Sequence, residues 1–400
     1  MSKVAILGFG TVGSGVYEVL RTNAKEISRK TGKEFDIKYV LDIRDFDDHP
    51  EKNLFTKNFD DIVNDAEVDI VAEVIGGATI AYEFTKRALA AGKSVVTSNK
   101  ELVATHGFEL LELAKKNGVK YLFEASVGGG IPVIRPMARC LAGNEITEIS
   151  GILNGTTNYI LTQMQNGMDF DVALKSAQEK GYAEANPAAD VEGTDACRKI
   201  AILSSLAYGC EVDPDKISVE GITSLSLSDT VLAEKMGYGI KLIGHSKKVG
   251  DKIEIWVSPM LVSKNHLIAG VNGVFNAISV KGNMVDETLF YGRGAGKEPT
   301  ASAVVADVID IAISEGTESI CVWDKRKDNY VIDINETKTA YFVKVKSSEK
   351  DALRAQFGNI TCAEEGDEVA FITGEMTFGE IKAKTEKLGI TTKVIRVLNS

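Results

Sequence analysis

One stretch of the chain, from Gly151 to Leu203, concentrates polar side chains that could do chemistry among apolar helix positions. Its polar members are Asn154, Thr156, Thr157, Tyr182, Glu184, Asp190, Asp195 and Lys199. Solubility does not require such density. A pocket that binds a small zwitterion and moves a proton does, because it needs carboxylates for an ammonium group, donors for a carboxylate and an acid for the proton. The stretch therefore predicts a site for a small amino acid.

Lys199 is the predicted proton donor of this site. A helix is expected over residues 194–208, and Asp195, Lys199, Ile202 and Leu206 follow one face of it. The face begins charged and ends apolar, so it should point inward, which leaves the lysine partly desolvated and suited to proton transfer. The alternative is an exposed ion pair between Asp195 and Lys199. Histidine catalysis has less support, since the four histidines form no recognisable constellation with carboxylates.

The segment GILNGTTNYIL supplies a turn with amide and hydroxyl donors that opens a helix. Such a helix start suits the carboxylate of an amino acid, and the alternative is helix capping alone. Glu184, Asp190 and Asp195 offer negative charge for the ammonium group.

Elements that would position a nucleotide lie at the N-terminal end. Residues 3–8 (KVAILG) predict a buried strand, and GFGTVGSGV places Gly8, Gly10 and Gly13 in GxGxxG spacing before a helix. The first glycine allows a tight turn, the second admits a pyrophosphate and the third permits close helix–strand packing. Thr11 and Val12 lie inside the same turn. The pattern predicts a dinucleotide site, with a purely structural turn as the alternative.

Further strands are expected at 37–42, 68–75, 94–98 and 120–125, separated by helical patterns. This alternation predicts a doubly wound parallel sheet, whose ligands bind beyond the carboxyl ends of the strands. Three strand ends are therefore of interest: 75–77 with Gly76, 98–100 with Lys100, and 124–131. Lys100 could touch a ligand there or simply begin the next helix.

The sequence leaves NAD and NADP open. Asp42, at the end of the second strand, could hold a ribose 2′-hydroxyl. Arg44 follows it and Lys57 lies further along, and cations at this position would suit a 2′-phosphate and favour NADP.

Composition narrows the class of protein. A net charge of −11 disfavours nucleic acid as the main partner, and no apolar run approaches the length of a membrane helix. The five scattered cysteines fit neither a disulfide framework nor a zinc site. With no signal-peptide pattern at the start, we expect a reduced, cytoplasmic protein.

The C-terminal stretch 338–400 predicts strand, helix, strand, strand, helix, strand, which is a ferredoxin-like βαββαβ unit. It resembles an ACT domain, a small-ligand regulatory module of amino-acid enzymes. The pieces with catalytic chemistry all precede it, so we expect it to be unnecessary for building the active site.

Six segments together resemble the homoserine dehydrogenase family, in family order from residue 8 to about 310. They are GFGTVGSGV, SNKELVATHG, EASVGGGIPVI, NGTTNYIL, GYAEANPAADVEGTDACRKIAIL and GRGAGKEPTASAVVADV. The resemblance implies reversible NAD(P)H-dependent reduction of L-aspartate 4-semialdehyde to L-homoserine in threonine and methionine biosynthesis. No kinase-like segment precedes residue 1 in the sequence, so we expect a form that is not fused to an aspartokinase. Asn186 stands where the family often has aspartate, and we expect little consequence.

The resemblance also implies roles for single residues. Lys199 would protonate the aldehyde oxygen, and Lys100 would touch both substrate and cofactor. The acids Glu184, Asp190 and Asp195 would bind substrate, in a pocket also lined by Gly155, Thr156 and Tyr182. The second glycine-rich turn, with Gly296, would begin a helix that borders the nicotinamide. The loop EASVGGGIP would hold sodium or potassium through Glu124, Val127, Gly129 and Ile131.

The expected architecture has three parts. A Rossmann NAD(P)-binding domain covers 1–130 and about 300–320, an α+β catalytic and dimerisation domain covers 131–299, and the ACT-like domain covers 336–400. The resemblance implies a homodimer or higher oligomer, and an amino-acid effector is expected at the tail. Two rivals stay open: another Rossmann dehydrogenase of amino or oxo acids, and a nucleotide-binding regulator whose tail senses amino acids.

Overall fold

A computed structural model describes residues 1–314, 316, 319–358, 361–389 and 392–398. The chain divides into two compact units. The first contains Met1–Glu145, Ala201–Pro214 and Gly292–Lys327, and the second contains Ile146–Ile200, Asp215–Tyr291 and Asp328–Ser400. Among the helices of the described ranges, none combines the length and apolar character needed to cross a membrane.

The first unit is built on a six-stranded sheet in the order β3-β2-β1-β4-β5-β6. Every neighbouring pair is parallel, which confirms the predicted doubly wound sheet. β3 was not predicted, because two residues carry no periodicity. The elements are β1 (Ser2–Leu7), α1 (Thr11–Thr22), α2 (Ala24–Thr31), β2 (Phe35–Leu41), β3 (Phe55–Thr56), α3 (Asp60–Val63), β4 (Ile70–Glu73), α4 (Thr79–Ala90), β5 (Ser94–Thr97), α5 (Lys100–Lys116), β6 (Tyr121–Leu122) and α11 (Lys297–Ile313).

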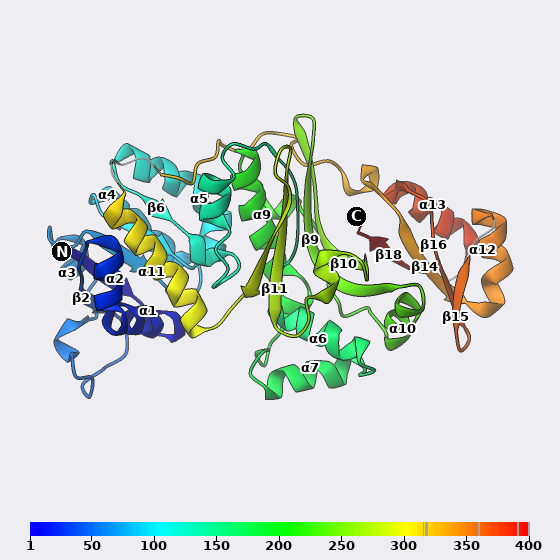
Figure 1. Ribbon diagram of the computed structural model, residues 1–400, viewed down its shortest axis with the longest axis horizontal. Coiled ribbons are helices and arrows are strands. Elements are labelled where there is room, and N and C mark those ends of the chain that lie inside the picture. Colours follow the sequence, from blue (N-terminus) through cyan, green and yellow to red (C-terminus); the bar gives the residue numbers. More distant parts are fainter. Residues whose placement is uncertain (315, 317–318, 359–360, 390–391, 399–400) are drawn as a thin grey trace. The chain divides into compact units, whose positions relative to one another are not determined.

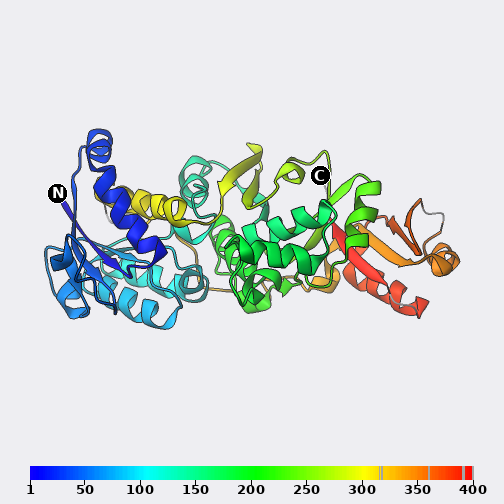
Figure 2. The same cartoon turned by 90° about the horizontal axis from the view of Figure 1, so that it is seen from below.

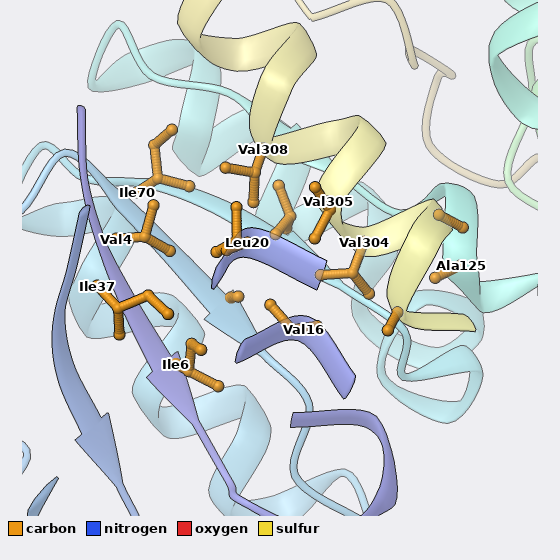
Figure 3. Close-up of a cluster of buried hydrophobic side chains, with 14 of the residues drawn as sticks. Val4, Ile6, Val16, Leu20, Ile37, Ile70, Ala125, Val304, Val305 and Val308 are labelled. Atoms are coloured by element: carbon orange, nitrogen blue, oxygen red, sulfur yellow. The ribbon is translucent and has the colours of Figure 1, made fainter. Parts of the chain in front are cut away.

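α11, far along the chain, shares one hydrophobic core with the N-terminal strands and α1 (Figure 3). Val4 and Ile6 of β1 meet Val304 and Val308 of α11 in this core, and all four are fully buried. α1 and α11 also lie side by side (Figures 1 and 2). Gly15 permits this approach, because a Cβ there would lie 2.9 Å from the Cβ of Ala301.

The second unit is built on a ten-stranded sheet in the order β12-β11-β7-β9-β10-β18-β14-β16-β15, with β8 beside β10. Its first part contains β7 (Ile146–Ile152), α6 (Gly155–Gln165), α7 (Phe170–Glu179), α8 (Ala188–Val191), β8 (Ser218–Val219), α10 (Leu227–Lys235), β9 (Tyr238–Val249), β10 (Lys252–Ser263) and β11 (Phe275–Gly282). Two elements are divided between the units: α9 (Thr194–Tyr208) belongs to the second unit up to Ile200, and β12 (Asp286–Arg293) belongs to it up to Tyr291. α9 approaches β9 closely, since a Cβ on Gly244 would lie 3.2 Å from the Cβ of Ile200.

The C-terminal part has the predicted βαββαβ order, and its strands run β18-β14-β16-β15 in antiparallel pairs. α12 and α13 lie against one face of these strands (Figures 1 and 2). Leu353 of α12 and Ile381 of α13 are buried in one core with the strand residues. The elements are β13 (Lys338–Thr339), β14 (Tyr341–Lys346), α12 (Lys350–Phe357), β15 (Cys362–Glu365), β16 (Glu368–Ile372), β17 (Met376–Thr377), α13 (Phe378–Leu388) and β18 (Lys393–Val397).

This tail is continuous with the rest of its unit. β18 pairs with β10 in parallel, through Met260 opposite Arg396 and Leu261 opposite Val397. Lys344 of β14 is buried and forms an ion pair of 2.9 Å with Asp229 of α10. Cutting the chain before the tail would therefore expose a strand edge and leave a buried carboxylate without its lysine.

Candidate active site

The residues predicted to bind substrate begin at the turn after β7. Asn154 is the N-cap of α6, with extended backbone, and its Oδ1 accepts a hydrogen bond of 2.9 Å from the N–H of Thr157. Gly155 follows because space is short: a Cβ there would lie 2.7 Å from the carbonyl oxygen of Val274. The capping role considered from the sequence thus describes the Oδ1 atom of Asn154.

The side-chain amide of Asn154 binds two carboxylates, which the spacing of residues in the sequence did not predict. Its Nδ2 donates hydrogen bonds to Asp190 Oδ1 at 2.7 Å and to Asp195 Oδ2 at 2.8 Å. One asparagine therefore joins the starts of α6 and α9 to α8, and it holds two carboxylates in one cluster. The sequence contained a signal for this, since N-G-T-T is a capping pattern, but nothing in it showed where the amide would point.

Lys199 lies inside the same cluster. Its Nζ donates to Asp195 Oδ2 and to the carbonyl oxygen of Leu153, both at 2.7 Å. Lys199 is 8% exposed and Asp195 is 6% exposed, so the exposed-pair alternative is wrong and the inward-facing stripe is confirmed. An ammonium group has three N–H donors, and two are used by the described residues. The third is available to a bound molecule.

The remaining predicted substrate residues are Thr156 in α6 and, in the loop before α8, Tyr182 and Glu184. Thr156 donates its hydroxyl to the carbonyl oxygen of Tyr182 at 2.6 Å, and the Tyr182 ring packs edge-on against Tyr159 at 5.1 Å. Glu184 is exposed, and its carbonyl oxygen accepts from Gln178 Nε2 at 3.2 Å. The structure thus brings Asp190, Asp195 and Lys199 together and ties Thr156 to Tyr182. The described contacts join Glu184 to the loop through its backbone.

The dinucleotide turn in the first unit has the geometry that its glycines predict. Gly8 has φ +94°, in the region that favours glycine. A Cβ on Gly13 would lie 1.8 Å from the carbonyl oxygen of Gly8, so that position admits only glycine. A Cβ on Gly10 would meet nothing within 4 Å, which leaves space at the start of α1 for a phosphate. The residues present fit a dinucleotide.

At the end of β2, Asp42 and Arg44 bind each other. Arg44 donates from Nε and Nη2 to the two carboxylate oxygens of Asp42 at 2.9 Å, and Nη2 also donates to the carbonyl oxygen of Phe9. Asp42 accepts the N–H of Phe9 at 2.7 Å as well. Side-chain hydrogen bonds from Arg44 hold the pKa of Asp42 well below its ordinary value. Lys57 forms its own ion pair with Asp45 at 2.7 Å.

Lys100 is the first residue of α5, and a buried relay fixes the turn before it. Thr97 donates its hydroxyl to Glu73 at 2.6 Å and accepts the N–H of Asn99 at 2.9 Å. The Asn99 side chain caps α5 by accepting the N–H of Leu102, and its amide donates to the carbonyl oxygens of residues 75 and 77. Burial raises the pKa of Glu73 to about 7. Sequence reasoning missed this carboxylate, because a strand residue with apolar neighbours gives no chemical signal.

The two other glycines predicted at the cofactor also differ in their surroundings. A Cβ on Gly76 would meet nothing within 4 Å, so the loop after β4 is open. Gly296 is the N-cap of α11 with φ +124°, a conformation that favours glycine.

In the loop proposed for a cation, the carboxylate of Glu124 is already engaged. Oε1 accepts the N–H groups of Val133 and Ile134, and Oε2 accepts that of Arg135 at 2.7 Å. Each carboxylate oxygen has about two lone pairs, so Oε2 keeps capacity for one more partner. The described residues hold no cluster of three or more histidine, cysteine or acidic side chains suited to a metal. A hard monovalent ion held largely by backbone carbonyls still fits this donor set.

Comparison with known proteins shows which family has a similar sequence and fold. Residues 8–124 match the NAD-binding domain of homoserine dehydrogenase, and residues 132–309 match homoserine dehydrogenase itself. The Pseudomonas aeruginosa homoserine dehydrogenase is 40% identical over 370 residues, which cover 90% of this chain and 85% of that protein. A Thiobacillus denitrificans homoserine dehydrogenase structure has a TM-score of 0.91 and 37% identity, covering 100% of this chain and 98% of that one. A hyperthermophilic archaeal homoserine dehydrogenase in complex with NADPH has a TM-score of 0.67 and 28% identity, covering 79% of this chain and 99% of that one.

Proposed function

This chain belongs to the homoserine dehydrogenase family, and from that premise we propose that Lys199 is the proton donor of its reaction. The chain is an NAD(P)-dependent oxidoreductase, and the family's reaction interconverts L-aspartate 4-semialdehyde and L-homoserine. One observation carries the proposal: Lys199 is buried and donates to Asp195 and Leu153, and the described residues leave its third N–H for a ligand.

Lys199, Asp195 and Asn154 would then each have a separate role in the reaction. When a dinucleotide is bound, its nicotinamide would supply the hydride for the aldehyde carbon. Lys199 Nζ hydrogen-bonds the aldehyde oxygen and transfers a proton to it as negative charge develops there. Asp195 orients the ammonium group of Lys199 and offsets the positive charge of that lysine in a buried site. Asn154 holds Asp195 in place, so it is a positioning residue.

The substrate's ammonium group is proposed to lie near Asp190 and Glu184, with Gly155, Thr156 and Tyr182 lining the same pocket. Asp190 is supported by its bond to Asn154, which fixes a carboxylate next to the Lys199 cluster. Glu184 lies on an exposed loop and would have to turn toward the ligand. Its contribution is therefore expected to be to substrate affinity, measured as KM, more than to turnover.

For the cofactor we propose Gly8, Gly10, Thr11, Val12 and Gly13 at the pyrophosphate, with Gly76, Lys100 and Gly296 nearer the nicotinamide. NADP is the favoured form. Four N–H donors, one from Phe9 and three from Arg44, fill the lone pairs of the Asp42 carboxylate, so it is a poor acceptor for a ribose hydroxyl. Arg44 has an exposed guanidinium that could hold a 2′-phosphate, as Lys57 could. The archaeal relative's complex with NADPH is consistent with this choice.

A sodium or potassium ion is proposed in the loop of Glu124, Val127, Gly129 and Ile131. Support comes from the spare lone pair on Glu124 Oε2 and from the burial of the loop. The ion would order the loop, and no step of the reaction passes through it. Melting temperatures in potassium, sodium and choline chloride at equal ionic strength test this. The Glu124→Gln variant should lose any difference between the salts.

We also propose a homodimer or higher oligomer paired through the middle region of the chain, and an amino-acid effector at the ACT-like tail. Threonine is the first candidate effector, because homoserine leads to it. Sedimentation of the full chain measures the first proposal. Titration of homoserine turnover with threonine, methionine, isoleucine and lysine measures the second.

The reaction itself is tested by cofactor reduction with L-homoserine, using NAD and NADP in parallel. A panel of other hydroxy and amino acids separates this activity from that of another Rossmann dehydrogenase. Robust turnover of a different substrate, or amino-acid binding without any turnover, would instead support one of the two rivals.

A further inference from the structure

Arg396 of β18 is buried where the tail sheet meets the catalytic sheet. It is 6% exposed, and three aromatic rings surround its guanidinium carbon, at 4.9 Å from Trp256, 5.6 Å from Tyr341 and 4.4 Å from Phe378. Trp256 belongs to β10, while the other two rings belong to the tail. The arginine therefore lies at a junction that couples two parts of one unit.

The partners of this guanidinium are incomplete for a buried cation. Its described hydrogen bonds both come from Nη1, to Thr337 Oγ1 at 3.3 Å and to the hydroxyl of Tyr341 at 3.1 Å. Within the described part of the chain, no carboxylate lies at ion-pair distance from it, although Glu220 and Glu254 act on it from further away. Burying a charge without a counterion lowers the stability of the folded protein. We therefore expect the Arg396 guanidinium to have a function, such as binding an anionic group.

A cavity of about 40 Å³ adjoins the arginine and is lined by two more polar side chains without partners. Trp256 Nε1 and Ser258 Oγ are buried and lack hydrogen-bond partners among the described residues. The indole is held in place, because the ring of His245 stacks on it at 4.3 Å. Burial lowers the pKa of His245 to about 3, so this imidazole is neutral and adds no charge to the cavity. The indole N–H of Trp256, the hydroxyl of Ser258 and the guanidinium of Arg396 can all donate, and Arg396 is the cation among the residues that line the cavity.

We propose that this cavity binds the carboxylate group of a free α-amino acid. The Arg396 guanidinium, with the two further donors from Trp256 and Ser258, matches the acceptors of a carboxylate. The volume of the cavity is sufficient for a carboxylate group but not for a whole amino acid. Glu220 lines the rim, its side chain is 51% exposed, and its Oε1 lies 3.8 Å from Lys393 Nζ, so the carboxylate has room to accept from the ammonium group of a ligand as well. That acid makes amino acids a better match than simple carboxylates.

The inference rests on the proposed regulatory role of the tail and gives that role a location. A ligand here touches Arg396 and Phe378 from the tail and Trp256 and Ser258 from β10. It would therefore stabilise the docked arrangement of β18 on β10. β10 pairs with β9, and β9 with β7, the strand that leads to Leu153 and Asn154. Any effect on turnover must come from a different affinity for two states of this arrangement.

Calorimetry on the full-length protein tests the site. The probes are L-threonine, L-methionine, L-isoleucine and L-lysine. Two kinds of comparison ligand are titrated separately: the amide of each amino acid, which lacks the carboxylate, and acetate, which lacks the ammonium group. We expect at least one amino acid to bind, its amide to bind roughly tenfold more weakly or not at all, and acetate to bind weakly. Equal binding of acid and amide, or no binding by any of the four, would overturn the proposal, and the second result would mean that the cavity holds only water.

Variants of the same chain locate the binding. Arg396→Gln and Ser258→Ala should each weaken it, the first by roughly tenfold or more, because a charge-assisted bond is lost. Glu220→Gln should reduce the preference for the amino acid over acetate. The matched control is Arg354→Gln, an exposed arginine of α12, which should bind as the parent does. If Arg396→Gln does not fold, the Ser258 and Glu220 variants decide.

Failure of this site and failure of the proposed function give different results. Amino-acid binding that survives all three cavity variants overturns the site and leaves homoserine turnover untouched. Absence of homoserine turnover in the parent protein overturns the proposed function, while the calorimetric results still decide the site. The cavity variants are expected to keep normal turnover without effector.

Discussion

Replacing Asp195 with asparagine removes one buried negative charge and keeps the shape of the side chain. Asp195 Oδ2 accepts from Lys199 at 2.7 Å and from Asn154 at 2.8 Å, and both ion-pair partners are more than nine-tenths buried. Solvent therefore screens the pair little. A charge-assisted hydrogen bond contributes about 1.5–3 kcal/mol, and breaking a buried pair outright costs about 3–5 kcal/mol. Because the asparagine oxygen can still accept from Lys199, we expect a loss of about 2 kcal/mol in the free energy of unfolding.

The activity of Asp195→Asn should fall as well. Lys199 keeps its bond to the Leu153 carbonyl but loses the charge that orients it. Misplacement of a reacting group by about 1 Å costs roughly 10²-fold, so kcat is expected to fall by roughly 10- to 100-fold with KM little changed. Urea unfolding at pH 7 and steady-state kinetics with L-homoserine measure the two effects.

The control for this substitution is Glu26→Gln in α2. Glu26 pairs with Arg29 and Lys30 at the helix surface, where solvent screens the interaction. This variant should leave both the urea midpoint and turnover unchanged. If Asp195→Asn behaves like Glu26→Gln, Asp195 does not hold Lys199 and the account of the cluster is refuted.

Three further predictions concern the nucleotide half. The Gly10→Ala variant should lose dinucleotide affinity, because its methyl group fills the space left for phosphate. The control Gly143→Ala, at another open position, should keep that affinity, and both variants should unfold like the parent. Equal dinucleotide affinity of the two variants in titrations would place the phosphate elsewhere. Replacing Arg44 and Lys57 with alanine should weaken NADP binding by roughly 10- to 100-fold and NAD binding little, since phosphate contacts are lost; equal losses would exclude both residues from that position. Burial raises the pKa of Glu73 from its ordinary 4.5 to about 7, so the folded protein keeps a proton in that window that the unfolded chain has lost. Stability should fall by up to about 3 kcal/mol as pH rises from about 4.5 to 7, and Glu73→Gln should flatten that slope; parallel pH profiles for variant and parent would contradict the buried carboxylate.

Patterns that repeat along the chain made much of the fold predictable. Strand–glycine–helix order at Gly8–Gly13 indicated the parallel sheet, and the stripe from Asp195 to Ile202 indicated that Lys199 is buried. Both signals are local, because a helix or strand fixes which of its own residues share a face. The βαββαβ order of the tail followed from the same kind of periodicity.

Contacts between distant segments could not be predicted in this way. The bond from Asn154 to Asp190 spans 36 residues, and the one from Thr97 to Glu73 spans 24. The pairing of β18 with β10 depends on a sheet edge that no local pattern reveals. These contacts arise from how elements pack, and a single sequence records packing only indirectly.

The rate of homoserine-dependent cofactor reduction by the Lys199→Met variant shows whether Lys199 donates the proton. Methionine keeps an unbranched side chain of similar length, and Asp195 keeps its bond from Asn154. With the fraction of folded protein and the cofactor Kd measured in the same samples, kcat should fall by roughly 10²- to 10⁴-fold, the range for loss of a general acid, while the Kd stays near that of the parent. A folded Lys199→Met variant that turns over L-homoserine at close to the parental rate would contradict the claim.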